Sequence, residues 1–160
     1  MSLRAEAQNE ESKSANYQSI ENSEIVELQL RFVYCPIQTT LQVLGKKWTL
    51  LILRDIGFRK IDRFNRLLET VSGITPRVLS MRIKELERAG YIKCIKNRRA
   101  PMVVQWALTR KGRDTLPILL KLLSFGSKWY PEFVFEDSKA RTKLSQIFTP
   151  REMKILNKYS

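Results

Sequence analysis

The chain has 160 residues, with 29 Lys and Arg against 16 Asp and Glu, and a formal net charge of +13. It has no histidine and two cysteines, which excludes Ser-His-Asp and Cys-His catalytic arrangements, multi-cysteine zinc sites and a disulfide-based scaffold. No acid/base pair, nucleophile–base pair or cofactor loop is visible. We therefore predict that the chain is not an enzyme and has no metal or cofactor site.

The positive charge is concentrated in one part of the chain. Residues 1–30 carry two basic and six acidic side chains, whereas residues 54–113 carry sixteen basic and five acidic ones. Unless the organism's proteome is generally basic, this excess predicts nucleic acid or an anionic membrane surface as the partner. There is no apolar run of about 18 residues and no signal peptide. We expect a cytoplasmic, nucleoid-associated protein without a membrane partner.

Three parts are predicted in chain order. Residues 1–30 form a polar, partly disordered arm, residues 31–131 a winged-helix domain and residues 132–160 a helical extension. Residues 24–35 fit a strand and a helix equally well. We expect the arm to dock on the domain or on a second subunit.

A strongly apolar helix is predicted over residues 37–55. Pro36 suits its first position, and apolar residues then recur every three or four positions. This places Gly45 inside the helix and Trp48 in the core. The segment 45–48 lacks the residues of a phosphate-binding loop.

Two short helices joined by a glycine-containing turn are predicted at residues 62–90. Asp62 caps the first, Gly73 lies in the turn, Thr75 caps the second and Gly90 ends it. The second helix has an apolar face of Leu79, Ile83 and Leu86 and a basic face of Arg77, Ser80, Met81, Lys84 and Arg88. Such a face is often only solvated surface. The two helices together, however, are typical of a helix-turn-helix.

After residue 90 the apolar period changes from that of a helix to that of a strand, which predicts a β-hairpin at residues 91–108. The inward-facing residues are Ile92, Cys94, Val104, Trp106 and Leu108. Its tip contains Arg98 and Arg99, which would reach phosphates or the minor groove. The predicted fold class is therefore α+β and mostly helical, with a winged helix-turn-helix flanked by N- and C-terminal dimerisation helices.

A dimerisation helix is predicted at residues 109–130, with Thr109 as its cap. It is apolar almost all round, and a domain of this size has little room to bury such a helix alone. A second copy is the predicted cover; the alternative is that the helix completes the monomer core. The predicted interface consists of Leu116, Leu119, Leu120, Leu123 and Trp129. A last helix with a capping box is predicted from Thr149, Pro150 and Glu152.

Several motifs together resemble the HxlR-type winged-helix transcription regulators of prokaryotes, within the wider MarR-like group. They are Cys35-Pro36, the run from Gly45 to Asp55, Arg63-Phe64-Asn65, the run from Gly73 to Ser80, Glu85-Leu86-Glu87 with Gly90, and Leu108-Thr109 with Gly112. The resemblance covers about residues 35–126 and implies a homodimeric DNA-binding regulator. The arm and the tail after Pro131 are longer than the family core, and the wing tip is shorter.

The resemblance also makes Cys35 a candidate redox sensor, because some relatives use a cysteine at this position to sense oxidants or electrophiles. That role needs an exposed thiol with a low pKa. Lys46, Lys47 and the helix N-terminus would be sources of positive field. The alternative is a buried cysteine that packs like a small apolar residue, which is our interpretation of Cys94.

These observations predict a sequence-specific transcriptional regulator that binds double-stranded DNA as a homodimer on a pseudo-palindromic operator. The side chains expected to read base edges are Thr75, Arg77, Ser80, Met81 and Lys84. Those expected to hold phosphates are Arg63, Arg66, Arg88, Arg98 and Arg99. The alternative is a non-specific or chromatin-like nucleic-acid-binding winged-helix protein. A small-molecule or a redox effector would be compatible with either.

Overall fold

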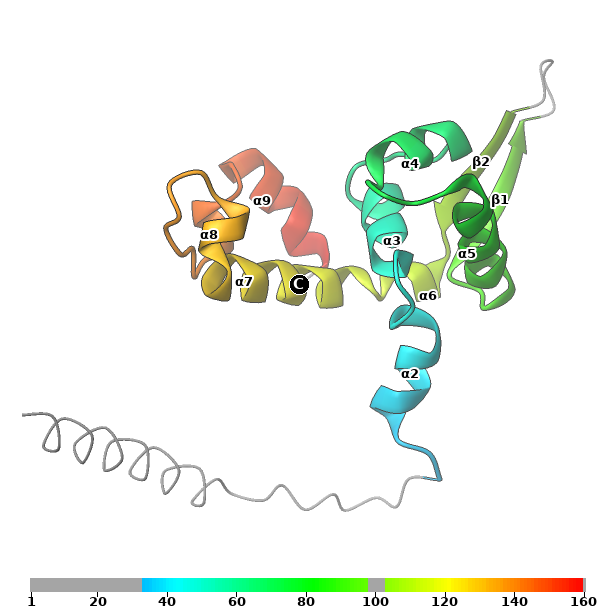
Figure 1. The fold of residues 1–160 in the computed structure, drawn as a ribbon, viewed down its shortest axis with the longest axis horizontal. Coiled ribbons are helices and arrows are strands. Elements are labelled where there is room, and N and C mark those ends of the chain that lie inside the picture. Colours follow the sequence, from blue (N-terminus) through cyan, green and yellow to red (C-terminus); the bar gives the residue numbers. More distant parts are fainter. Residues whose placement is uncertain (1–32, 98–102, 160) are drawn as a thin grey trace, which may run out of the picture. The chain divides into compact units, whose positions relative to one another are not determined.

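The computed structural model describes residues 33–97 and 103–159. The predicted N-terminal arm and the wing tip, with Arg98 and Arg99, lie outside the described residues. The chain divides into two units, residues 1–34 and 35–160. All the elements described below belong to the second unit (Figure 1).

The helix predicted over residues 37–55 is two helices, α2 (Pro36–Leu44) and α3 (Thr49–Gly57). Between them, Trp48 has a left-handed backbone with φ of 77°, through which a right-handed helix cannot continue. Its indole lies against Gly73, where an added Cβ would come within 3.3 Å of the ring. The prediction of one continuous helix is therefore wrong, although Trp48 does pack against the core.

The next two helices, α4 (Phe64–Thr70) and α5 (Pro76–Arg88), lie in the segment predicted as a helix-turn-helix. The Thr75 hydroxyl accepts a hydrogen bond from the Val78 N–H at 3.3 Å, as predicted for a helix cap. Asp62 does not cap α4. Its carboxylate accepts a hydrogen bond from Gln105 Nε2 at 2.7 Å, and Arg63 occupies the N-cap position without a side-chain cap.

The predicted hairpin is present as β1 (Ile92–Asn97) and β2 (Val103–Leu108), which pair antiparallel with Cys94 opposite Trp106. Ile92 and Leu108 are buried and Ile95 is exposed, so alternate residues face the core as predicted. The backbone N–H of Trp106 donates to the backbone carbonyl of Asp62 at 2.9 Å. This bond ties β2 to the segment between α3 and α4.

The helix predicted at residues 109–130 is divided into α6 (Arg110–Arg113) and α7 (Leu116–Trp129). Pro117 explains the break, because it has no N–H to donate and its ring would clash with the carbonyl of residue 113 in a continuous helix. Thr109 caps α6 as predicted, since its hydroxyl accepts from the Gly112 N–H at 3.1 Å. A side chain at Gly112 would collide with the carbonyl oxygen of Tyr91.

The C-terminal residues form four short elements: α8 (Pro131–Val134), η1 (Leu144–Gln146), α9 (Pro150–Leu156) and η2 (Asn157–Tyr159). The predicted capping box is present, because the Thr149 hydroxyl accepts from the Glu152 N–H at 3.3 Å and the Glu152 carboxylate accepts from the Thr149 N–H at 2.8 Å. Among the described residues, no helix has the length and apolar character to cross a bilayer.

One apolar core lies beneath the helix-turn-helix and the hairpin. It includes buried side chains from α3, α4, α5, both strands and the start of α7, among them Ile52, Leu53, Leu67, Leu79, Ile92 and Leu116. This shared core determines which face of α5 points outward.

Candidate nucleic-acid interface

The outward face of α5 forms a shallow groove of about 430 Å³, lined by Arg77, Ser80, Met81, Lys84, Glu85 and Arg88. Four of the five residues predicted to read bases are among them. The fifth, Thr75, is exposed at the N-cap of the same helix. The structure thus brings the predicted reading residues together along one open helix face.

The opposite face of α5 holds this orientation. Leu79, Ile83 and Leu86 are buried in the core. Burial of each such side chain is worth roughly 1.5–3 kcal/mol. A rotation of α5 about its axis would expose them, so the groove face remains the face that is open to a partner.

A polar network that the sequence did not predict joins α5 to the turn between α2 and α3. Glu85 accepts from Arg82 Nη1 at 2.7 Å and from Lys46 Nζ at 3.0 Å, and Arg82 Nε donates to the Lys47 carbonyl at 3.1 Å. The hydrogen bond from Lys46, together with that from Arg82, lowers the pKa of Glu85. The carboxylate in the groove is thus paired with two cations from within the protomer.

A second unpredicted network holds the first half of the helix-turn-helix. Asp55, at the end of α3, is fully buried and accepts hydrogen bonds from the Thr70 hydroxyl at 2.7 Å, Arg54 Nε at 2.8 Å and Arg59 Nη1 at 3.4 Å. Burial raises the pKa of this carboxyl, but the hydrogen bonds from Arg54 and Thr70 and the two guanidinium charges outweigh burial and lower it. Asp55 therefore remains charged and fixes the end of α4 against α3.

The predicted phosphate-binding arginines that the structure describes lie at helix ends. Arg63 and Arg66 are exposed at the start of α4, and Arg88 is exposed in the last turn of α5. Arg66 forms a 3.2 Å ion pair with the exposed carboxylate of Glu69. Such a surface pair is weak, so Arg66 remains able to contact a phosphate.

The predicted dimer residues of α7 are placed in two environments. Leu116, Leu119 and Leu120 are buried inside the protomer, Leu123 is half-buried and Trp129 is exposed. The first three therefore support the alternative of a helix that completes the monomer core. The exposed side of α7 instead carries a stripe of Ile118, Leu122, Phe125 and Trp129, which are 43–58% exposed.

The two cysteines also differ in exposure. Cys35 is exposed at the N-cap of α2, and Cys94 is partly buried in β1. Lys46 and Lys47 lie beyond the other end of α2, about 14 Å away for nine helical residues. Lys46 pairs with Glu85, and the Lys47 ammonium lies 4.6 Å from the ring centre of Trp48. Both lysines are therefore about one helix length from Cys35 and have contacts of their own at that end of α2.

A helix-turn-helix followed by an antiparallel hairpin, with a basic groove on the second helix, defines a winged-helix DNA-binding protein. The family model described as HxlR-like helix-turn-helix matches residues 43–133. The chain belongs to this family of transcriptional regulators, which are not enzymes.

Individual proteins that are similar to this chain in sequence or structure are also described as regulators. An uncharacterised helix-turn-helix transcriptional regulator, sll1512 of Synechocystis, is 34% identical over 95 residues, which are 59% of this chain and 70% of that protein. A crystal structure described as a MarR-family regulator of Porphyromonas gingivalis W83 has 29% identity and a TM-score of 0.52, and covers 62% of this chain and 96% of its own. The oxidised redox regulator HypR has 32% identity and a TM-score of 0.51, and covers 57% and 94%.

Proposed function

We propose that this regulator recognises a specific DNA sequence as a homodimer, on a pseudo-palindromic operator. The observation that carries the proposal is the groove on α5, where Arg77, Ser80, Met81, Lys84 and Arg88 share one open face. A helix of this size fits the major groove of B-DNA, where every base pair presents a distinct pattern of donors and acceptors.

Each side chain of the groove suits a particular contact. Arg77, in the first turn of α5, can pair bidentately with the O6 and N7 of a guanine, and Lys84 can donate to the same acceptors. Thr75 and Ser80 supply adaptable hydroxyls, and Met81 an apolar surface for a thymine methyl group. Arg63, Arg66 and Arg88 would hold phosphates, together with Arg98 and Arg99 of the wing tip.

The exposed stripe on α7 supports the homodimer. Its four residues, at positions 118, 122, 125 and 129, recur at alternating spacings of four and three, which is the seam pattern of packed helices. A similar exposed pair, Ile37 and Leu41, lies on α2. A two-fold axis through such a seam would place two copies of α5 about 34–36 Å apart, or a multiple of that distance, along one face of the DNA.

Selection of bound fragments of genomic DNA by the purified full-length protein, at about 50 and 200 mM salt, tests this proposal. We expect one pseudo-palindromic motif that is retained at the higher salt. Binding without a motif, which collapses between the two salt concentrations, would instead establish the non-specific nucleic-acid binder.

Cys35 provides a second, regulatory proposal. We infer that oxidants or electrophiles act on this thiol, because it is exposed at the start of α2, near the exposed Ile37 and Leu41. HypR, described as a redox regulator, supports it as a similar protein. Diamide should change operator binding by the wild type and by Cys94→Ser, and should leave Cys35→Ser unaffected. An equal response of Cys35→Ser would refute the role of this cysteine.

A further inference from the structure

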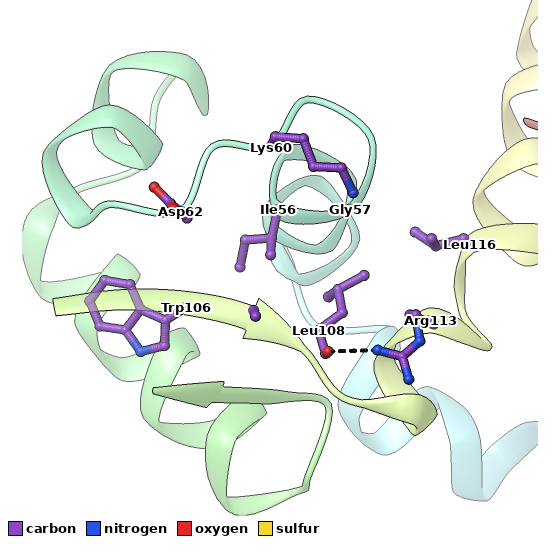
Figure 2. A pocket seen from close by; sticks show the side chains of 9 residues that line it. Ile56, Gly57, Lys60, Asp62, Trp106, Leu108, Arg113 and Leu116 are labelled. Carbon is purple, nitrogen blue, oxygen red and sulfur yellow. Dashed lines mark hydrogen bonds between the residues drawn. The ribbon is translucent and has the colours of Figure 1, made fainter. Parts of the chain in front are cut away.

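A cavity of about 280 Å³ lies away from the α5 groove. It is bordered by the end of α3, the segment between α3 and α4, strand β2, α6 and the start of α7. Figure 2 shows its lining: Ile56, Gly57, Lys60, Asp62, Trp106, Leu108, Arg113 and Leu116. None of these residues takes part in the DNA-binding surface proposed above.

The charges of the cavity are separated between its two ends. In Figure 2 the Lys60 ammonium, the Arg113 guanidinium and Leu116 lie toward one end, and Asp62 and Trp106 lie toward the other. The Asp62 carboxylate is occupied by the Gln105 amide at 2.7 Å. Both cations are exposed, and within the described part of the chain neither has an ion pair with a carboxylate.

The backbone holds Lys60 in place. Lys60 has a left-handed conformation with φ of 56°, which is unfavourable for a side chain other than glycine and persists only where neighbouring structure enforces it. Hydrogen bonds of the two residues that follow Lys60 do so: the backbone N–H of Ile61 donates to the Asp55 carbonyl at 3.0 Å, and the Asp62 carbonyl accepts from the backbone N–H of Trp106 at 2.9 Å.

The Arg113 side chain is oriented by a hydrogen bond of its own. Its Nη1 donates to the Leu108 carbonyl at 3.3 Å (Figure 2), and the remaining guanidinium N–H groups are able to meet an anion. Ile56 and Leu108 lie between the two ends and, with Trp106 at the far end, form an apolar wall (Figure 2). A bare phosphate or sulfate would leave this wall without contacts.

We propose that this cavity is a binding site for a small monocarboxylate with a compact apolar body. The carboxylate would lie between Lys60 and Arg113, and the apolar body would lie against Ile56, Leu108 and Trp106. The volume is at the lower limit of ligand pockets, which restricts the ligand to about the size of one six-membered ring. A dicarboxylate would place its second charge toward Asp62 and would be repelled.

Fluorine NMR of the full-length protein labelled with 5-fluorotryptophan tests the site directly, without DNA, so its outcome is independent of the function proposed above. The three tryptophans are Trp48, Trp106 and Trp129, and the Trp106 signal is assigned from a Trp106→Phe variant. Cyclohexanecarboxylate is the probe. We expect it to shift the Trp106 signal saturably and to leave the other two signals unchanged.

Matched ligands and variants complete the test. Cyclohexanecarboxamide and trans-1,4-cyclohexanedicarboxylate should each bind at least about tenfold more weakly, because one lacks the charge and the other adds a repelled charge. Lys60→Gln and Arg113→Gln should each weaken binding by about tenfold or more. Lys121→Gln, an equal loss of charge on α7 outside the cavity, should have no effect. An unchanged Trp48 signal establishes that each variant is folded, because Trp48 packs against the core.

Two results would overturn the proposal. One is the absence of a saturable Trp106 shift up to about 10 mM acid, a concentration that corresponds to a very weak site. The other is equal binding of the acid, the amide and the diacid, or equal binding by the Lys60 and Lys121 variants. Either would show that the two cations do not form a carboxylate site.

Discussion

At the scale of single residues, Asp55 links the end of α3 to the end of α4. Its buried carboxylate is held by Arg54, Arg59 and Thr70. Since these partners lower its pKa in the folded protein, the charged form stabilises the fold at every pH above the ordinary aspartate pKa of about 3.9. This stability is lost as the pH falls from that value through the lower pKa of the folded state.

Asp55→Asn should therefore destabilise the protein by about 2–3 kcal/mol near neutral pH, because it leaves two guanidinium groups without their buried partner. The difference from wild type should shrink below about pH 4, where the wild-type carboxylate also becomes protonated. Urea unfolding at several pH values measures both effects. The control is Asp137→Asn, which removes an exposed carboxylate paired with Arg141. It should lower the free energy of unfolding by less than Asp55→Asn does. A constant difference across the whole pH range would contradict this assignment.

Arg77 is the residue on which base reading can be tested most directly. Arg77→Ala should cost about 1–3 kcal/mol on the selected operator and much less on unrelated DNA. Arg77→Lys keeps the charge but loses the bidentate geometry, so it should retain non-specific binding and lose discrimination. Fluorescence anisotropy with both DNAs gives the comparison. If Arg77→Ala weakens both equally, Arg77 contacts phosphate and does not read a base.

At the scale of elements, α7 has a buried side and an exposed side, which divide along its length and around its axis. Leu116, Leu119 and Leu120 fill the core of their own protomer, whereas Leu122 and Phe125 remain exposed. A helix that is apolar all round can be shared in this way between a core and a partner. The exposed side of α7 is thus where the proposed dimer would form.

A charge in the exposed stripe should separate the subunits. Phe125→Glu is expected to convert the dimer to a monomer in sedimentation analysis, because a buried unpaired carboxylate is costly in an apolar interface. Lys121→Glu introduces the same side chain on α7 outside the stripe and should leave the dimer intact. A Phe125→Glu protein that still sediments as a dimer would place the interface elsewhere on the chain.

At the scale of the whole molecule, the charge of +13 would attract the protein to the phosphate backbone of DNA. Each phosphate contact releases about one counterion, so affinity for DNA falls steeply as salt rises. The residues proposed to read bases would act differently, since they would distinguish sequences on top of a common electrostatic attraction. The two contributions are separable by experiment.

Arg88→Gln should reduce the slope of log K against log salt by about 1 for each subunit and should leave the selected motif unchanged. Arg88 suits this test because it is exposed at the end of α5 and has the expected role of a phosphate contact. Binding titrations at four salt concentrations provide the slope. A changed motif with an unchanged slope would make Arg88 a base-reading residue.

The sequence by itself determined the helix-turn-helix and the hairpin that follows it, the buried face of α5, the caps at Thr75, Thr109 and Thr149, and the basic character of the open face. These features depend on local periodicity and on short-range hydrogen bonds, which neighbouring residues specify. The same local information identified the family.

Only the tertiary structure decided the features that depend on residues far apart in the chain. The left-handed turn at Trp48 is held by packing on Gly73, the partner of Asp62 lies in β2, and the pairing of Glu85 with Lys46 joins segments 39 residues apart. Likewise, Leu116 and Leu122 are both leucines of one helix, and packing against distant elements such as α3 makes the first buried and leaves the second exposed. Periodicity shows that a residue is apolar, whereas its partner is set by the three-dimensional arrangement.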